Sequence, residues 1–280
     1  MNTKVAEKGI RIIATAICLI AAIIILTPFV WIFLNSFKYF KDIVSFNIIG
    51  SEWTLYNYWI VLLSKDENII RELMNSIICT LSTLVIVIPI SLFSGYGFAR
   101  SRFSLGIKAF LIGILLFARI IPSVAIAFPY YVISTELGIY DTYIALIIVY
   151  VIRTLPLAVF MMITFIEDVP KEVEEAAMVD GASLWQTLKS VILPLILPGV
   201  AATAVFAFIY AWNDFLFAAY LTNVHAVNLQ VRIAGFNAEY FIRWGELSAA
   251  VIISSIPVIV FAILTQKYLI RGLTLGAVKG

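Results

Sequence analysis

Apolar runs of about 20 residues recur along the chain, and they constrain its fold more than any other feature. They lie at residues 12–34, 73–95, 109–129, 142–165, 195–218 and 247–266. At about 1.5 Å per residue, a helix of about 20 residues crosses the ~30 Å hydrocarbon layer of a bilayer. Only 13% of residues are charged, too few to cover a water-facing surface. The sequence therefore predicts an all-α polytopic membrane protein with six transmembrane helices, forming one domain over residues 1–280.

Prolines lie within or at the edges of these runs. A proline removes a backbone donor, but helices in a bundle tolerate it where neighbouring groups satisfy the freed carbonyls. We therefore expect kinks rather than breaks at Pro28, Pro89, Pro122, Pro129, Pro156, Pro194, Pro198 and Pro257.

Basic residues are divided unevenly between the two sides of the predicted bundle. One side holds Lys or Arg at positions 4, 8, 11, 100, 102, 108, 171, 189, 267, 271 and 279, and the other at 38, 41, 65, 71, 232 and 243. Because cytoplasmic loops carry the excess of basic residues, both termini are predicted to be cytoplasmic.

The first apolar run, at residues 12–34, is too long for the apolar region of a signal peptide, so we expect it to be retained. Cys18 and Cys79, both within spans, are predicted to be buried apolar residues without a disulfide or metal.

The predicted cytoplasmic loop at residues 166–194 is polar, unlike the spans around it. Pro170 suits a first helical turn, and Glu172, Glu174 and Glu175 would lie near the positive end of the helix dipole. Gly181 is placed to end the helix. This pattern predicts a short helix over about 170–180.

A second helix is expected directly after that turn, because Ser183 and Gln186 have the spacing of a capping box. On the first helix, one face collects small and short side chains that would fit a groove in a partner protein: Val173, Ala176, Ala177 and Asp180. An amphipathic helix resting on lipid is the alternative, and the spacing alone leaves both open.

Four stretches carry a family resemblance. Glu175-Ala176-Ala177, then Gly181, then Val191-Ile192-Leu193-Pro194 resembles the EAA loop of binding-protein-dependent ABC importer permeases, with Val191 where the family usually has Ile. GYGFARSRF at 95–103, AWNDF at 211–215 and RGLTLGAVKG at 271–280 resemble the second, maltose-type permease subunit of carbohydrate importers. The resemblance covers nearly the whole chain.

The resemblance implies a permease that imports a sugar or oligosaccharide across the cytoplasmic (inner) membrane by alternating access. The implied partners are a second homologous permease, two ATP-binding cassette subunits and an extracytoplasmic sugar-binding protein. The 166–194 loop would dock on the ATPase through Glu174, Glu175, Ala176, Ala177, Asp180 and Gly181, with Glu175 pairing with a basic residue there. The C-terminal tail would contact the ATPase through Gly276, Ala277, Lys279 and Gly280.

Residues that would carry chemistry of their own are missing from the sequence. It contains no Gly-x4-Gly-Lys-Ser/Thr loop for nucleotide phosphates. The single histidine, His225, has no nucleophile pattern beside it and is predicted to be a surface residue. We therefore expect no enzyme activity, no bound cofactor or metal and no nucleic-acid partner, with ATP and Mg²⁺ bound by the partner ATPase.

Two arginines lie deep within predicted spans, where an unpaired charge is costly. Arg119 and Arg153, with Asn213 and Asp214 near the outer end of the fifth span, are candidates for a polar translocation path. The alternative is structural pairing with backbone carbonyls, an acid or a partner subunit. The depth of Asp214 argues against its direct pairing with Arg153.

Aromatic residues gather in the two long outer loops. Membrane-interface anchoring explains Trp53, Tyr56, Tyr58, Trp59, Tyr240, Phe241 and Trp244 without a partner. The family resemblance instead implies that the loop at 219–246 contacts the binding protein.

An ion-coupled secondary transporter is the alternative function. It requires an ionisable residue at an internal repeat and a broken helix at mid-membrane. The sequence shows neither a repeat nor an acid at the depth of Arg119 and Arg153.

Overall fold

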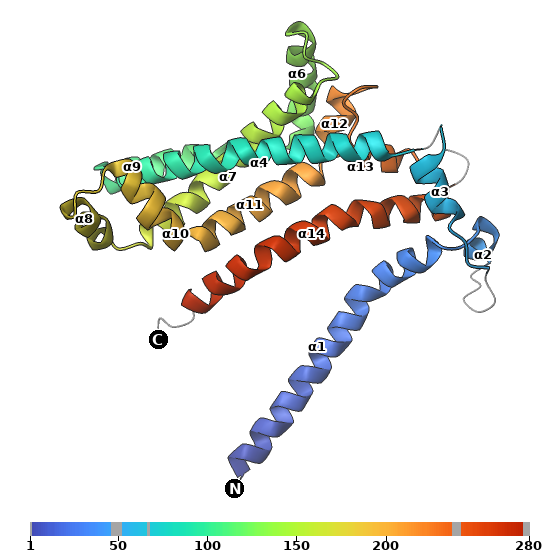
Figure 1. Ribbon diagram of the computed structural model, residues 1–280, viewed down its shortest axis with the longest axis horizontal. Helices are drawn as coiled ribbons and strands as arrows, with labels where there is room; N and C mark the ends of the chain where they lie inside the picture. The colour runs from blue at the N-terminus through green and yellow to red at the C-terminus, as the bar shows by residue number, and fades with distance from the viewer. Residues whose placement is uncertain (1, 46–51, 66–67, 237–241, 277–280) are drawn as a thin grey trace. The chain divides into compact units, whose positions relative to one another are not determined.

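The computed structural model describes residues 2–45, 52–65, 68–236 and 242–276, with side chains for those between 11 and 268 (Figure 1). The described residues confirm the all-α prediction. The elements are α1 (Asn2–Asn35), α2 (Phe40–Val44), α3 (Tyr56–Leu63), α4 (Ile70–Ala99), α5 (Leu105–Phe117), α6 (Ser123–Glu136), α7 (Tyr143–Glu167), α8 (Lys171–Val179), α9 (Leu184–Thr187), the π-helix η1 (Leu188–Ile192), α10 (Leu193–Leu195), α11 (Leu197–Trp212), α12 (Leu216–Leu221), α13 (Leu229–Ala234) and α14 (Trp244–Gly276).

Four of these helices are long and apolar enough to cross a membrane, over Arg11–Asn35, Ile70–Ala99, Tyr143–Glu167 and Trp244–Tyr268. Each contains one of the predicted spans. A further pair, Leu184–Leu195 and Leu197–Trp212, passes the same test together but is bent by 77°. Among the described residues the helices thus supply four candidate membrane spans, or five if the bent pair is one span.

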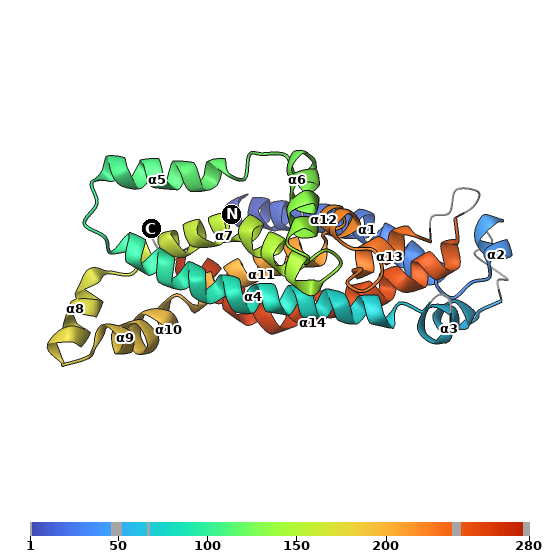
Figure 2. The same ribbon diagram turned by 90° about the horizontal axis from the view of Figure 1, so that it is seen from above.

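The predicted span at 109–129 is not one helix. It is divided between α5 and α6, which run in different directions (Figure 2). Pro122 is the N-cap of α6, and a proline disfavours helical backbone in the residue before it. The expectation of a kink at Pro122 was therefore wrong, and the chain breaks there.

The predicted span at 195–218 also differs from the structure. Its helix α11 ends at Trp212, and α12 begins only at Leu216. At the other end, Pro194 and Pro198 flank the sharp bend between α10 and α11. The other five prolines, at positions 28, 89, 129, 156 and 257, lie inside continuous helices as predicted.

The chain divides into two compact units, residues 1–70 with 233–255 and residues 71–232 with 256–280. In the first unit, buried Asn57 of α3 donates to the carbonyls of Ser36 (3.0 Å) and Lys38 (2.9 Å) just after α1. Large apolar side chains of α1, such as Ile24, are exposed. Such surface requires lipid or another protein.

The second unit is built around α7, which packs on α11, α5 and α12. One cluster joins Leu146, Tyr150 and Phe217 near the start of α7, and another joins Leu92, Met162 and Ile192 near its end. Cys79 is buried in the first cluster as a free thiol. Cys18 is also free but exposed, so the prediction of its burial was wrong.

Candidate functional site

The 166–194 loop forms the predicted helix, turn and helix at one end of α4 and α7 (Figure 1). The first helix, α8, ends in a Schellman motif: Gly181 N–H donates to the Met178 carbonyl (3.0 Å) and Ala182 N–H to the Ala177 carbonyl (3.0 Å). Gly181 has a φ of 88°, in the left-handed region that favours glycine. The turn is therefore fixed by its own hydrogen bonds.

The second helix of the loop starts with the predicted capping box. The Ser183 backbone N–H donates to Gln186 Oε1 (2.7 Å), and the Gln186 N–H donates to Ser183 Oγ (3.3 Å). Helix α8 contacts both α9 and η1. The loop therefore has a defined shape.

Several side chains of this loop face outward. Glu175, Ala176 and Asp180 are exposed and Ala177 is half-buried. Apolar side chains beside them are exposed too, Val179 to 87% and Trp185 to 56%. An exposed acid beside alanines and uncovered apolar groups is a surface suited to docking on a protein.

Glu174 faces the other way, which corrects its predicted place on the docking surface. It is 5% exposed. Its Oε1 accepts from Arg100 Nε (2.6 Å) and forms an ion pair with Nη2 of the same guanidinium, while Oε2 accepts from the Tyr96 hydroxyl (2.9 Å). Successive helical residues point in different directions, so Glu174 binds inside the chain while Glu175 remains exposed.

A second polar centre lies where α7 begins, at the opposite end from the loop. Asp141 has a φ of 58° and projects its carboxylate onto the backbone of residues 223–226. That carboxylate accepts from the N–H groups of Asn223 (3.0 Å), Val224 (3.0 Å), His225 (2.9 Å) and Ala226 (3.1 Å). Asp141 thus ties the connection between α6 and α7 to the segment after α12.

This contact sets the charge of Asp141. Partial burial alone would raise its pKa, but the backbone donors, with that of Asn223 the largest, outweigh burial and lower the pKa from 3.8 to about 2. The carboxylate is therefore ionised at all ordinary pH values.

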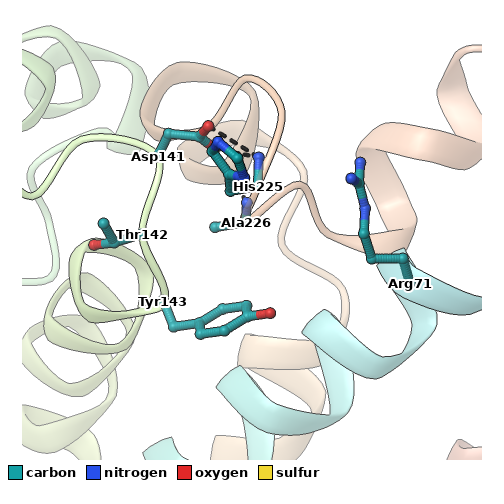
Figure 3. Close-up of a pocket in the computed structure, with 6 residues that line it drawn as sticks. All are labelled: Arg71, Asp141, Thr142, Tyr143, His225 and Ala226. Atoms are coloured by element: carbon teal, nitrogen blue, oxygen red, sulfur yellow. Dashed lines mark hydrogen bonds between the residues drawn. The ribbon is translucent and has the colours of Figure 1, made fainter.

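Asp141 lines a cavity of about 490 Å³ together with Arg71, Thr142, Tyr143, His225 and Ala226 (Figure 3). Arg71 bonds Glu72 Oε1 at 3.2 Å but stays largely exposed. His225 is exposed, as predicted. The Tyr143 hydroxyl bonds Asn75 Oδ1 (2.8 Å), whose amide donates to the Val227 carbonyl (2.8 Å). The recess thus has polar side chains in its lining, and hydrogen bonds hold Asp141 and Tyr143 in place.

Arg153, in the middle of α7, bonds the break between α5 and α6. Its Nη1 donates to the Ala118 carbonyl (3.2 Å), and its Nη2 donates to the Ile121 carbonyl (3.4 Å) and Ser123 Oγ (3.3 Å). In an unbroken helix the Ala118 carbonyl would accept from residue 122, which is a proline without an N–H. Arg153 supplies the missing donor. It is therefore paired with backbone carbonyls, which is the structural alternative to a place in the translocation path.

Arg119 lies in the same break and behaves differently. Its guanidinium lies over the Phe206 ring (4.9 Å) and the Tyr210 ring (6.0 Å) of α11, a favourable arrangement for a cation. Its Nη1 is buried and has no hydrogen-bond partner among the described residues. Arg119 therefore keeps an unused donor, as Arg153 does at its Nε, but unlike Arg153 it lies over aromatic rings.

Asn213 and Asp214 lie in the gap between α11 and α12. The Asn213 side chain donates to the Ile209 carbonyl (3.0 Å), which caps the end of α11. Asp214 accepts from the N–H of Ala218 (3.0 Å) in α12 and from the Tyr150 hydroxyl (3.0 Å). Both side chains thus support the backbone where the predicted fifth span breaks.

The remaining predicted contacts are described only in part. Gly276 is the last residue of α14, while Ala277, Lys279 and Gly280 lie outside the described residues, as do Tyr240 and Phe241. In the first unit Trp53, Tyr56, Trp59 and Trp244 are exposed, whereas Tyr58 bonds Ser36 Oγ (2.8 Å). The exposed aromatics leave both anchoring and docking open.

Comparison with protein families identifies the chain. Residues 88–275, which include the 166–194 loop, match the family model described as "Binding-protein-dependent transport system inner membrane component". The chain belongs to this family. It is therefore a multi-pass inner-membrane permease subunit of an ABC transporter and is not itself an ATPase. Family membership decides against the secondary-transporter alternative.

Individual relatives agree along the whole length. The permease is 36% identical over 280 residues to the probable ABC transporter permease protein y4oR of Sinorhizobium fredii, covering 100% of this chain and 99% of the relative. It is 36% identical over 284 residues to the trehalose/maltose transport system permease protein MalG of Thermococcus litoralis, covering 100% of each. One chain of a bacterial ABC transporter crystal structure, from a system that imports the polysaccharide alginate, has the same fold, with a TM-score of 0.74, 22% identity and coverage of 94% and 97%.

Sequence reasoning missed three features of the site. Tyr96 and Arg100 lie in the GYGFARSRF stretch, but that stretch alone does not indicate a bond to Glu174. The role of Arg153 could have been found, since Pro122 leaves Ala118 without its i+4 donor. No sequence signal points to Asp141.

We predict that Gly181→Val loosens the 166–194 loop, because a β-branched residue at positive φ costs about 1–3 kcal/mol. Limited proteolysis of the purified protein at Lys171 and Lys189 should become faster. Gly181→Asn is the matched control, since asparagine tolerates left-handed backbone, and it should be cleaved at nearly the native rate. Equal rates for the valine variant and the native protein would contradict the role of the turn.

We predict that Asp141→Asn lowers the thermal unfolding midpoint near neutral pH. The folded pKa is depressed, so the stabilisation is fully present above about 3.8 and is lost as the pH falls through about 2. The difference between native and variant protein should therefore be constant near neutral pH and shrink in acid. Glu136→Gln, at a neighbouring exposed acid, is the control. A difference that grows in acid would contradict the assignment.

We predict that Arg153→Met destabilises the permease by about 1–3 kcal/mol, because it strands the Ala118 carbonyl. Adding Pro122→Ala should recover part of the loss by restoring a backbone N–H at residue 122. Thermal unfolding of the two variants in detergent, with Arg119→Met for comparison, measures this. If Arg153→Met unfolds like the native protein yet transports nothing, Arg153 serves the path rather than the break.

Proposed function

We propose that this permease is one half of the pore of an importer for a sugar or oligosaccharide, driven by a separate ATPase through the 166–194 loop. The observation that carries the proposal is the loop's geometry: a helix-turn-helix fixed by two capping motifs, with Glu175 and apolar side chains exposed. A subunit without a nucleotide site can receive energy only through such physical contact.

The names of the relatives support a carbohydrate as substrate. They include the trehalose/maltose permease at 36% identity, the trehalose permease SugB of Mycobacterium tuberculosis at 36%, and the diacetylchitobiose permease DasC of Streptomyces coelicolor at 30%. These proteins are named for glucose- or glucosamine-based disaccharides. We therefore infer a sugar or oligosaccharide rather than an inorganic ion as the transported species.

We propose a six-span topology in which α5 and α6 together form one broken span. Lys108 near the start of α5 lies 3.9 Å from Glu167 at the end of α7, whereas α6 leads to Asp141 at the start of α7. The broken pair thus runs from one end of α7 to the other. With the bent pair as another span, both termini would be cytoplasmic, in accord with the distribution of basic residues.

Each partner of the proposed importer would contact a different part of this chain. The exposed apolar side chains of α1 would contact lipid and the second, homologous permease. Two ATP-binding cassette subunits, which bind ATP and Mg²⁺, would dock on Glu175, Ala176, Ala177, Asp180 and Gly181, with the tail at Gly276, Ala277, Lys279 and Gly280 as a further contact. The Asp141 recess and the exposed aromatics would face a sugar-binding protein.

Arg119 is the residue we assign to the translocation path. It lies in a broken segment, over two aromatic rings, with an unused donor. Aromatic faces and free N–H donors are groups that contact sugars well. Arg153, Asn213 and Asp214 would instead hold the surrounding backbone. ATP-driven closure would then alternate the pore between outward and inward openings.

We predict that Glu175→Lys leaves the permease assembled but at least tenfold less active in transport, because it reverses the charge presented to the ATPase. The test is gentle affinity purification from the native membrane, identification of the copurifying chains, and measurement of ATP hydrolysis and sugar uptake after reconstitution. Glu172→Lys, an exposed acid of the same helix, is the matched control. Purification without an ATPase, or sugar-stimulated hydrolysis that is unchanged in the Glu175 variant, would contradict the proposal.

A further inference from the structure

Glu174 and its neighbours form a closed set of contacts that docking on the ATPase does not explain. We call Tyr96, Arg100, Glu174 and the Val169 carbonyl the Arg100 clamp. The Arg100 guanidinium binds Glu174 Oε1 and also donates to the Val169 carbonyl (2.9 Å). The Tyr96 hydroxyl fills Oε2 (2.9 Å). Both oxygens of Glu174 are therefore used within this chain.

The charges of the clamp are shielded from solvent. The side chains of Arg100 and Glu174 are 14% and 6% exposed. A pair this buried is held firmly, because removing one partner leaves the other charge uncompensated. An exposed ion pair would contribute far less. The clamp is therefore a strong mechanical joint.

The clamp joins elements that are far apart along the chain. Helix α8 continues covalently into α7 on one side and into α9 and α11 on the other, but α4 ends at Ala99, well before it. Polar contact between α8 and the end of α4 comes from Tyr96 and Arg100, which lie four residues apart on one helical face. Apart from these bonds, the described contacts between α4 and the loop are apolar, and they include the stacking of Phe93 on Trp185.

The GYGFARSRF stretch is arranged around this joint. A side chain at Gly95 would place its Cβ 2.7 Å from the Met162 Cβ of α7, so glycine is required for α4 and α7 to approach closely. The close approach brings Tyr96 and Arg100 within reach of the connection between α7 and α8. The stretch thus supplies one contact for packing and two for the clamp.

We propose that the Arg100 clamp transmits movement of the docking loop to α4, which makes Glu174 a positioning residue for transport. This inference rests on the proposed function. A force applied at the exposed face around Glu175 moves α8 as a rigid body, and the clamp carries that movement into α4 directly. The two adjacent acids therefore have different tasks: Glu175 receives the force and Glu174 passes it on.

The test compares single and paired charge changes in the complete transporter, reconstituted in liposomes. Glu174→Gln, Arg100→Glu and Glu174→Arg break the ion pair, Tyr96→Phe removes one hydrogen bond, and Arg100→Glu combined with Glu174→Arg reverses the pair. Glu172→Gln is the matched control at an exposed acid. The measured quantities are copurification of the ATPase, ATP hydrolysed and sugar imported.

We expect each pair-breaking variant to retain the ATPase and hydrolyse ATP while using at least tenfold more ATP per sugar. Tyr96→Phe should cause a smaller increase, and the reversed pair should recover at least part of the coupling. An unchanged ratio of ATP to sugar, or loss of the ATPase in Glu174→Gln and Tyr96→Phe alike, would overturn the proposal. If Glu175→Lys uncouples while the clamp variants do not, the clamp fails and the proposed function stands. If no ATPase copurifies with the native chain, the proposed function fails.

Discussion

Hydrocarbon offers no hydrogen bonds, so every backbone carbonyl at membrane depth must find its donor within protein. In the proposed six-span topology this requirement applies to the break at Pro122. The Ala118 carbonyl loses its helical donor there, and Arg153 of α7 replaces it at 3.2 Å. Because that donor comes from a side chain of α7, α6 can leave the direction of α5 without stranding the backbone. The charge of Arg153 is in turn stabilised by the oxygen atoms of Ala118, Ile121 and Ser123, which accept its hydrogen bonds.

An acidic side chain near each end of α7 binds it to neighbouring segments, but the two acids use different hydrogen-bond donors. At its start, Asp141 binds backbone N–H groups of residues 223–226. Beyond its end, Glu174 binds the side chains of Arg100 and Tyr96. The Asp141 carboxylate, which accepts from backbone N–H groups, joins two loops and holds them together. A carboxylate bound by an arginine side chain joins two helices, and such a joint can pass movement from one helix to the other. In the proposed topology the first lies at the outer face and the second at the cytoplasmic face.

Most of the helices could be predicted from the sequence, because spans and caps are local properties. The capping box at Ser183 and the glycine turn at Gly181 follow from residue types a few positions apart. The breaks at Pro122 and after Trp212 could not be predicted from hydropathy, which continues through them. A broken apolar run persists only where other groups satisfy its backbone. At Pro122 that donor is Arg153, which is remote in sequence, whereas after Trp212 the local side chains of Asn213 and Asp214 contribute.

The same distinction separates the two acids of the EAA region. The sequence by itself determined an all-α membrane permease with a docking loop, since apolar periodicity, turn residues and family motifs are all short-range patterns. Only the tertiary structure decided that Glu174 faces Arg100 while Glu175 faces outward. It also decided that Arg153 donates to the backbone of the break while Arg119 lies over aromatic rings. The reason is that the direction and partner of a charged side chain depend on which helix lies beside it, and that neighbour is set by the packing of the whole bundle.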